Sequence, residues 1–148
     1  MTEAGTGTTE TVEEDGFSLR RHLPYDMLEA QTRTREALHE QGFEILSTID
    51  LGATLHAKLG ETLEPFVILG ACHPPLAHRA LEANREIGLL TPYNVVIRET
   101  ADGVLVEAVD PVALLNIIDE PELKAVAKEA RAGLAKALSR LPGRLSGS

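Results

Sequence analysis

The sequence contains few aromatic residues and almost no cysteine. Tryptophan is absent, and 3 Phe and 2 Tyr are the only aromatic residues in 148 positions. Any hydrophobic core must therefore be built from Leu, Val, Ile and Ala. The single cysteine, Cys72, excludes an intrachain disulfide. No apolar run approaches the roughly 20 residues that span a bilayer, so the sequence predicts a globular protein.

Basic residues are also scarce. The chain has 14 Lys and Arg against 23 Asp and Glu, a formal net charge of −9, and no basic cluster longer than Arg20-Arg21. Nucleic-acid binding depends on neutralising phosphates, so this charge argues against a DNA or RNA partner. The N-terminal stretch MTEAGTGTTETVEED has neither the basic nor the apolar region of a secretory signal. We therefore expect a cytoplasmic protein that does not insert into membranes.

The composition along the chain predicts one domain with two tails. Residues 1–15 are polar, acidic and rich in Thr and Gly, and are predicted to be disordered. Residues 16–142 form the predicted domain, and residues 143–148 a frayed C-terminal tail. A domain of this length buries about two thirds of its unfolded surface, which is enough for a stable core.

The first half of the domain alternates strand and helix signals. A strand is predicted over 17–22, followed by a helix that starts at Pro24 and stops at Gly42. Alternation over 43–49 predicts a strand with one strongly buried face. Asp50 then caps a short helix that carries Leu51, Leu55 and Leu59 on one stripe and closes at Gly60.

The second half contains the clearest local signals. The apolar run FVILGAC predicts a buried strand, and Pro74-Pro75 begins a helix that continues to about Gly88. Two β-branched runs, 93–99 and 104–109, flank Asp102-Gly103 and predict a hairpin, because Gly tolerates the positive φ of such a turn. A last helix is predicted from Glu120 to Leu141 with one apolar stripe.

These elements define the fold class. Because a tight hairpin joins antiparallel strands, the sheet cannot be entirely parallel. The alternation of strands and helices then favours an α+β fold, a two-layer α/β sandwich.

Several motifs resemble one known family. The strand GFEILSTID, the strand-to-helix junction ILGACHPPLA and the strand start TPYNVV occur in the order and spacing of the domain of unknown function 302 (DUF302) proteins. The resemblance covers roughly residues 17–111. It implies a mainly antiparallel, curved sheet backed by helices, similar to the TATA-binding-protein architecture, and a homodimer. It implies no activity, because the family has none assigned.

One position departs from the family pattern. Many members carry Cys where this chain has Tyr93. A mechanism that needs two thiols, one from the ACHPP junction and one from the following strand, is therefore not available here.

The strongest chemical candidate is Cys72-His73, because a thiol beside a helix N-terminus has a lowered pKa. The alternative is a buried, inert Cys72 with His73 as a capping neighbour. Tyr93 and Asn94 follow at the start of the next strand and offer polar groups to a ligand, although Asn94 could equally bond a neighbouring backbone. Ligand-binding residues are thus predicted at Cys72, His73, Tyr93 and Asn94.

Other chemistries have weaker patterns. Cys72 and four of the histidines lack metal-ligand spacing, because His73 and His78 are five residues apart and no HxxxH or CxxC occurs. No metal and no cofactor is therefore predicted. Asp50, Glu99 and Asp110 are candidate acid–base groups, but Asp50 and Asp110 are explained more simply as a helix cap and a turn residue.

The sequence leaves the catalytic question open. Its leading interpretation is a dimeric small-ligand binding or sensing module of otherwise unknown function. The alternative is a thiol-dependent enzyme or redox sensor that uses Cys72, and a structural dimer without ligand is a third possibility. Reactivity of Cys72 towards a thiol probe at pH 6 distinguishes the first two.

Overall fold

A single antiparallel sheet forms one layer of the structure, a computed structural model that describes residues 12–142. The strand order is β1-β2-β6-β5-β4-β3, and every neighbouring pair is antiparallel. The strands are β1 Glu13–Glu14, β2 Ser18–Leu23, β3 Glu44–Asp50, β4 Phe66–Cys72, β5 Tyr93–Thr100 and β6 Gly103–Val109. The helices are α1 Met27–Glu40, α2 Leu51–Leu59, α3 Pro74–Ala83, the 3-10 helix η2 Arg85–Leu89, α4 Pro111–Leu115 and α5 Pro121–Ser139.

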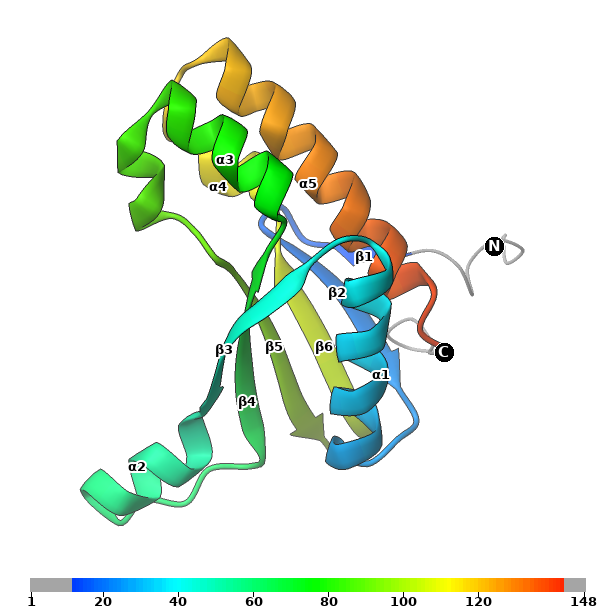
Figure 1. Ribbon diagram of the computed structural model, residues 1–148. Helices are drawn as coiled ribbons and strands as arrows, with labels where there is room; N and C mark the ends of the chain where they lie inside the picture. The colour runs from blue at the N-terminus through cyan, green and yellow to red at the C-terminus, as the bar shows by residue number, and fades with distance from the viewer. Residues whose placement is uncertain (1–11, 143–148) are drawn as a thin grey trace.

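Helices cover one face of this sheet. Helix α1 packs on β3, β5 and β6, and α5 packs on α1 and β2 (Figure 1). Helices α3 and α4 lie beyond one end of the strands, where they pack against α5. The result is a curved, unclosed sheet backed by helices, which confirms the predicted α+β two-layer fold.

Aspartate side chains begin three of the helices. Asp26, Asp50 and Asp110 each accept a hydrogen bond from a backbone N–H in the first turn, of Glu29, Ala53 and Val112 respectively. A side-chain acceptor at this position satisfies one of the free donors of the helix terminus. The cap at Asp50 and the left-handed Gly60 that ends α2 were both predicted from the sequence.

The core lies between the sheet and the helices and is mainly aliphatic, as the composition predicted, with Phe43 and Tyr93 as its aromatic members. The apolar stripe of α5 is buried along its whole length, which confirms the predicted last helix. The two strands of the predicted hairpin are also confirmed, but the turn lies one residue earlier than predicted: Ala101-Asp102 form the tip, and Gly103, with φ +143°, begins β6 opposite Thr100. The strands contribute alternate residues to the core: Leu19, Leu23, Val67, Leu69, Ala71, Tyr93, Val95, Ile97, Val104, Val106 and Ala108.

Two elements differ from the sequence prediction in where they begin or end. Strand β1 pairs with β2 although it falls in the segment 1–15 predicted to be disordered; residues 1–11 of that segment, and the tail 143–148, lie outside the described residues. The helix after Pro75 ends at Ala83 and not at Gly88. Asn84 is extended there and its side chain accepts a hydrogen bond from the Glu86 N–H, which starts η2 as a separate turn.

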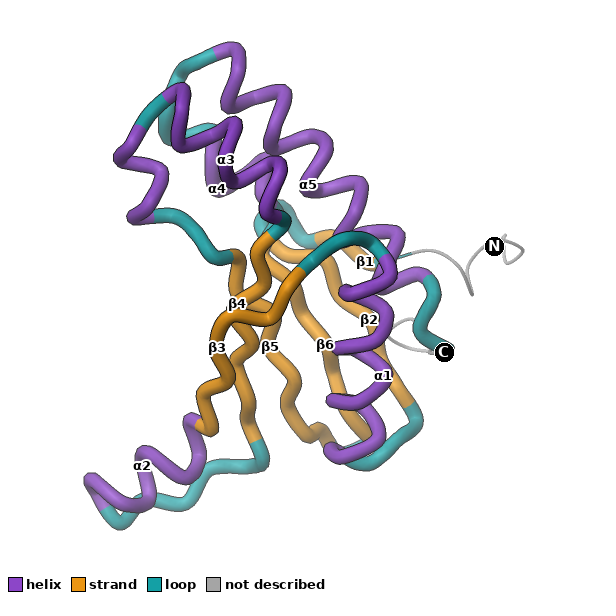
Figure 2. The backbone as a smooth tube through the Cα atoms, viewed as in Figure 1, coloured by secondary structure: helices purple, strands orange, loops and turns teal. Residues whose placement is uncertain are grey.

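The predicted buried face of the third strand is wrong. Phe43, just before β3, is fully buried, but within β3 only Ile45 is partly buried and every other residue is exposed. The leucine stripe of α2 is not buried either, since none of the α2 residues is. There are two physical reasons. The register of β3 shifts between Ile45 and Ser47, so Ser47 and Ile49 lie on the face opposite to Ile45. In addition, β3 is the edge strand, and its end and α2 extend away from the helical layer (Figure 2).

The opposite face of the sheet is not covered by any of the described helices. We call it the open face; its side chains alternate with those of the core and come from β2 to β6. They are Ser18, Arg20, His22, Ser47, Ile49, Phe66, Ile68, Gly70, Cys72, Asn94, Val96, Arg98, Leu105, Glu107 and Val109. Within residues 12–142, no helix is long and apolar enough to cross a membrane.

Candidate functional site

One row of residues crosses the open face from β3 to β2. Strand pairing places Ser47 opposite Gly70, Gly70 opposite Asn94, and Val109 opposite Ser18. Asn94 and Val109 are neighbours because Val95 pairs with Ala108 one position further along each strand. The side chains of this row form the floor of a surface groove.

The groove consists of two hollows that share Asn94 and Val109. The larger has a volume of about 440 Å³, and its walls come from the segment between η2 and β5 and from α4. Its lining residues are Ser47, Leu89, Leu90, Thr91, Pro92, Asn94, Val109 and Leu114. The smaller, of about 160 Å³, is lined by Phe17, Ser18, Asn94, Val96, Glu107, Ala108 and Val109. We refer to the two together as the groove.

Gly70, which has no side chain, allows Ser47 and Pro92 to approach each other closely at the floor of the groove. A Cβ atom at this position would lie 2.5 Å from the Ser47 Oγ and 2.9 Å from the Pro92 Cγ. Because real contacts of a Cβ are never that short, Ser47 and Pro92 occupy the space above a residue that must be glycine. A glycine inside a buried strand signals such a close approach, and this is the sequence signal that could have led to the groove.

A charged triplet lies beside the smaller hollow. Glu107 receives a hydrogen bond from the Arg98 Nε at 3.1 Å and pairs with the Arg20 Nε at 3.2 Å. All three side chains are about a quarter exposed, so their mutual attraction is partly screened by solvent. The triplet carries a net positive charge in a chain whose formal charge is −9.

The four predicted ligand-binding residues lie on two sides of the sheet. Cys72 and Asn94 belong to the open face, because Asn94 pairs with Gly70 and Cys72 follows Gly70 by two residues. Tyr93 pairs with Ala71 and points into the core, and His73 begins α3 on that side. Asn94 alone lines the groove.

His73 is held by packing. Its ring contacts the edge of the Phe43 ring, with centroids 5.3 Å apart and planes at 75°. Its Nδ1 is buried without a hydrogen-bond partner, and it does not cap α3. A Cβ at Gly42, where φ is +87°, would approach its Nε2 to 2.9 Å, so the imidazole fits between the glycine turn and Phe43.

Cys72 lies at the end of β4, opposite Glu44, and is partly exposed. Burial raises the pKa of the Cys72 thiol, and the negative charge of Glu44 raises that pKa further. Both effects favour the neutral thiol over the thiolate. The pKa of Cys72 is therefore shifted in the direction opposite to the one expected from the helix N-terminus.

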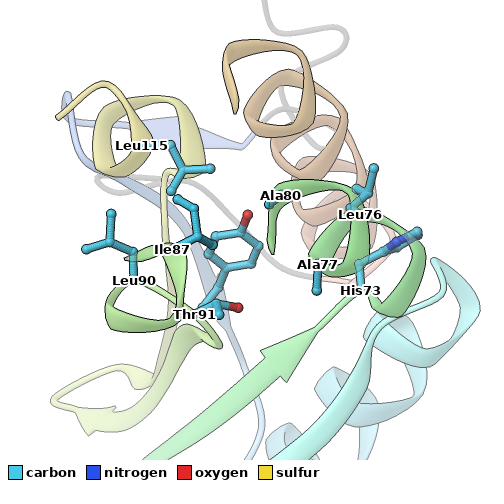
Figure 3. Close-up of a pocket in the computed structure, with 9 residues that line it drawn as sticks. His73, Leu76, Ala77, Ala80, Ile87, Leu90, Thr91 and Leu115 are labelled. Carbon is cyan, nitrogen blue, oxygen red and sulfur yellow. The ribbon is translucent and has the colours of Figure 1, made fainter. Parts of the chain in front are cut away.

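His73 and Tyr93 line a small internal cavity under α3. Its volume is about 10 Å³, which is room for about one water molecule. Leu76, Ala80, Ile87, Leu90 and Leu115 also line this cavity, and Figure 3 shows the His73 ring pointing away from Ile87 and Leu90. Burial, and then the nearby Cys72, raise the pKa of the Tyr93 phenol to about 12. This cavity is too small for an organic ligand.

The remaining candidates for chemistry are dispersed. Among the residues that the structure describes, no group of three or more His, Cys, Asp or Glu side chains is placed to hold a metal ion. Asp50 and Asp110 cap helices, and Glu99 is exposed on β5. Asp110 has a second partner that the sequence did not reveal, since its Oδ2 accepts a hydrogen bond from the Arg131 Nε at 3.0 Å.

Two comparisons with known proteins find a matching family and a similar solved structure. Residues 19–141 match the sequence profile of a family described as "Domain of unknown function DUF302". The structure is also similar to a crystal structure of an uncharacterized conserved protein DUF302 from Bacillus stearothermophilus. The TM-score is 0.79 at 27% sequence identity, over 84% of this chain and 97% of the other. No curated protein matches the sequence.

Proposed function

The chain belongs to the DUF302 family, and we propose that it is a small-ligand binding or sensing module whose ligand occupies the groove on the open face. The observation that carries this proposal is the larger hollow with Asn94 at its floor. A volume of about 440 Å³ is within the range of small-molecule sites, roughly 300–1,000 Å³. Ligand sites of this kind combine apolar walls with a few placed polar groups.

The lining of the hollow indicates the kind of ligand. Leucine, proline and valine side chains form most of the walls, and the polar groups are the Asn94 amide and the Ser47 and Thr91 hydroxyls. None of the described residues that line this hollow is charged. An amide offers both donors and an acceptor, and a hydroxyl offers one donor and an acceptor. These groups suit an uncharged, partly apolar molecule that bears a hydroxyl, carbonyl or amide group.

The alternative function, a thiol-dependent enzyme or redox sensor, has less support. Cys72 adjoins a carboxylate in place of a cation, and its pKa is raised. The His73 imidazole packs against Phe43. A reactive thiolate requires a cationic neighbour or a helix dipole strong enough to offset burial.

Ligand screening by NMR tests the proposal. A library of small uncharged compounds would be added to ¹⁵N-labelled protein, and the Asn94 side-chain amide and the Thr91 backbone amide followed. We expect hits that shift these signals in the wild type and lose about tenfold in affinity in Asn94→Leu, because a polar group of the bound ligand left without its partner costs about 1–3 kcal/mol, and 1.4 kcal/mol corresponds to tenfold.

A matched control is available in Asn116→Leu. Asn116 is an exposed asparagine at the end of α4 and does not line the groove. The Asn116→Leu variant should bind the hits with the same affinity as the wild type. Hits that shift signals elsewhere in the protein, or that bind Asn94→Leu as well as the wild type, would show that the groove is not the binding site.

A further inference from the structure

Phe17 is an exposed aromatic residue at the edge of the groove. It precedes β2 and lines the smaller hollow, and 66% of its surface is exposed. The other two phenylalanines of the chain are Phe43, which is fully buried, and Phe66, which is partly buried in β4. Single exposed apolar side chains are common on protein surfaces, so exposure alone assigns no role to Phe17. Its place in the hollow and the contacts of its backbone do assign one.

The backbone of Phe17 is held on both sides. The Asp15 Oδ1 accepts hydrogen bonds from the Phe17 N–H at 3.2 Å, the Ser18 N–H at 2.8 Å and the Ser18 hydroxyl at 2.9 Å. These hydrogen bonds, first of all the one from the Ser18 N–H, lower the pKa of the Asp15 carboxyl, which is therefore ionised at neutral pH. On the other side, the Phe17 carbonyl accepts a hydrogen bond from the Asp110 N–H at 2.7 Å. The position of the ring at the groove is thus set by the protein itself.

Asp110 connects Phe17 to the wall of the larger hollow. Its N–H holds Phe17, and its carboxylate caps α4, which supplies Leu114 to that wall. Asn94 lines both hollows and lies between the two walls. A site whose walls are in place before the ligand arrives loses less conformational entropy on binding, so this arrangement favours affinity.

Most polar side chains of the smaller hollow are already paired within the protein. The Ser18 hydroxyl donates to Asp15, and the Glu107 carboxylate belongs to the charged triplet. Among residues 12–142, no hydrogen bond holds the Asn94 side chain, so its amide is free to bind a ligand. The smaller hollow therefore combines one available polar group, at Asn94, with an apolar remainder.

The size and walls of this remainder fit one aromatic ring. The apolar lining residues are Phe17, Val96, Ala108 and Val109. The hollow measures about 160 Å³, and an apolar cavity of about 150 Å³ holds a benzene molecule. An aromatic group beside the Phe17 ring also gains the attraction between two π systems, which a saturated group of similar size lacks.

We infer that the ligand of the groove carries an aromatic ring, which packs against Phe17 in the smaller hollow while a carbonyl, amide or hydroxyl group of the same molecule binds Asn94. This inference rests on the proposed function and adds the chemical class of the ligand to it. Because Asn94 belongs to both hollows, a ring close to the polar group of the ligand reaches the smaller one. Asn94 orients the ligand, and Phe17 selects for its ring.

Two matched amides, phenylacetamide and cyclohexylacetamide, test the inference. Both are uncharged and similar in size, and they differ in whether the ring is aromatic. Titrated into the ¹⁵N-labelled full chain up to about 20 mM, both should shift the Asn94 side-chain amide. The dissociation constant of phenylacetamide should be about three- to tenfold lower, because only its ring interacts with Phe17 through the π system. Burial of apolar surface alone would favour the saturated ring.

Variants of Phe17 separate the aromatic contact from simple burial. Phe17→Leu keeps an apolar wall without the ring, so its dissociation constants for the two amides should be equal. Phe17→Tyr keeps the ring and should retain the preference for phenylacetamide. Phe66→Leu is the matched control, because Phe66 lies on the open face but lines neither hollow. It should also retain the preference.

Three results would overturn the inference. They are equal or tighter binding of cyclohexylacetamide by the wild type, a preference for phenylacetamide that persists in Phe17→Leu, and no binding of either amide. The proposed function fails by a different result, namely library hits whose affinity does not depend on Asn94. Hits that depend on Asn94 but show no preference for an aromatic ring would keep the groove as the binding site and remove Phe17 from its specificity.

Discussion

The carboxylate of Asp110 connects the end of the sheet to α5 through Arg131. Its Oδ1 accepts from the Val112 N–H and starts α4, while its Oδ2 accepts from the Arg131 Nε at 3.0 Å. Arg131 also pairs with Glu14 of β1. One buried side chain therefore fixes three elements, β6, α4 and α5, and through Arg131 it reaches the first strand.

Replacing Asp110 should destabilise the fold. Asp110→Ala removes a helix cap and a charge-assisted hydrogen bond, and we expect a loss of about 2–4 kcal/mol in the free energy of unfolding. Asp110→Asn keeps an acceptor for the cap and should lose about half as much. Urea denaturation gives both values. Asp119→Ala, which removes a solvent-exposed pair with Lys124, should change stability little. Equal effects of Asp110→Ala and Asp119→Ala would show that the Asp110 contacts are not structural.

Gly133 is required by the packing of Phe43. A Cβ at Gly133 would lie 2.9 Å from the Phe43 Cε1, and Phe43 is fully buried against the His73 ring. Alanine is better than glycine by about 1 kcal/mol in an unconstrained helix. In α5 the clash between the new Cβ and the Phe43 ring should outweigh the better helix propensity of alanine. Gly133→Ala should therefore lower the free energy of unfolding by about 1–2 kcal/mol.

A double-mutant cycle separates the clash from helix propensity. In a Phe43→Leu background the ring atoms that collide are gone, so Gly133→Ala should become at least about 1 kcal/mol less unfavourable than it is in the wild type. Stabilisation of the wild type by Gly133→Ala would contradict this packing.

Tyr93 should make the protein sensitive to alkali. Burial raises its pKa in the folded state from 10.0 to about 12, so the folded protein holds the phenol proton more tightly than the unfolded chain. The unfolded state binds fewer protons above pH 10, and stability must therefore fall as the pH rises from about 10 to 12. The loss should be on the order of 2 kcal/mol.

Tyr93→Phe provides the comparison, because it fills the same space without an ionisable group. Its free energy of unfolding should fall less than that of the wild type between pH 10 and pH 12, and the difference between the two free energies should be constant below pH 9, where the phenol is protonated in both states. Parallel curves for the two proteins from pH 8 to pH 12 would mean that Tyr93 titrates like an exposed phenol.

The Cys72 thiol should react slowly at neutral pH. Since burial and Glu44 both raise its pKa, its rate of alkylation should rise with pH later than that of free cysteine, which titrates near about 8.5. Glu44→Gln should move the inflection to lower pH by removing the nearby charge. Glu40→Gln, an exposed residue of α1, should not move it. Alkylation at pH 6 faster than that of free cysteine would favour the thiol-dependent function.

Local sequence signals determined the elements of this fold. Asp102-Gly103 between β-branched runs specified the β5–β6 hairpin to within one residue: Asp102 is at the tip, and Gly103 supplies the positive φ where β6 begins. The period of the apolar residues specified α5, and Asp50 and Gly60 marked the two ends of α2. Each of these signals acts over a few residues, so it can be interpreted without knowledge of the fold.

Only the tertiary structure decided which faces are covered. The alternation at Ile45, Ser47 and Ile49 predicted a strand, which is correct, but the register shifts between Ile45 and Ser47. Ile45 therefore faces the core side while Ser47 and Ile49 lie on the open face, and the sheet order places the strand at the edge. Likewise Tyr93 and Asn94 are adjacent in sequence and lie on opposite faces of the sheet, since successive side chains of a strand point to opposite sides. The groove is lined by residues of β2, β3, β5, β6, η2 and α4, which only the tertiary fold brings together.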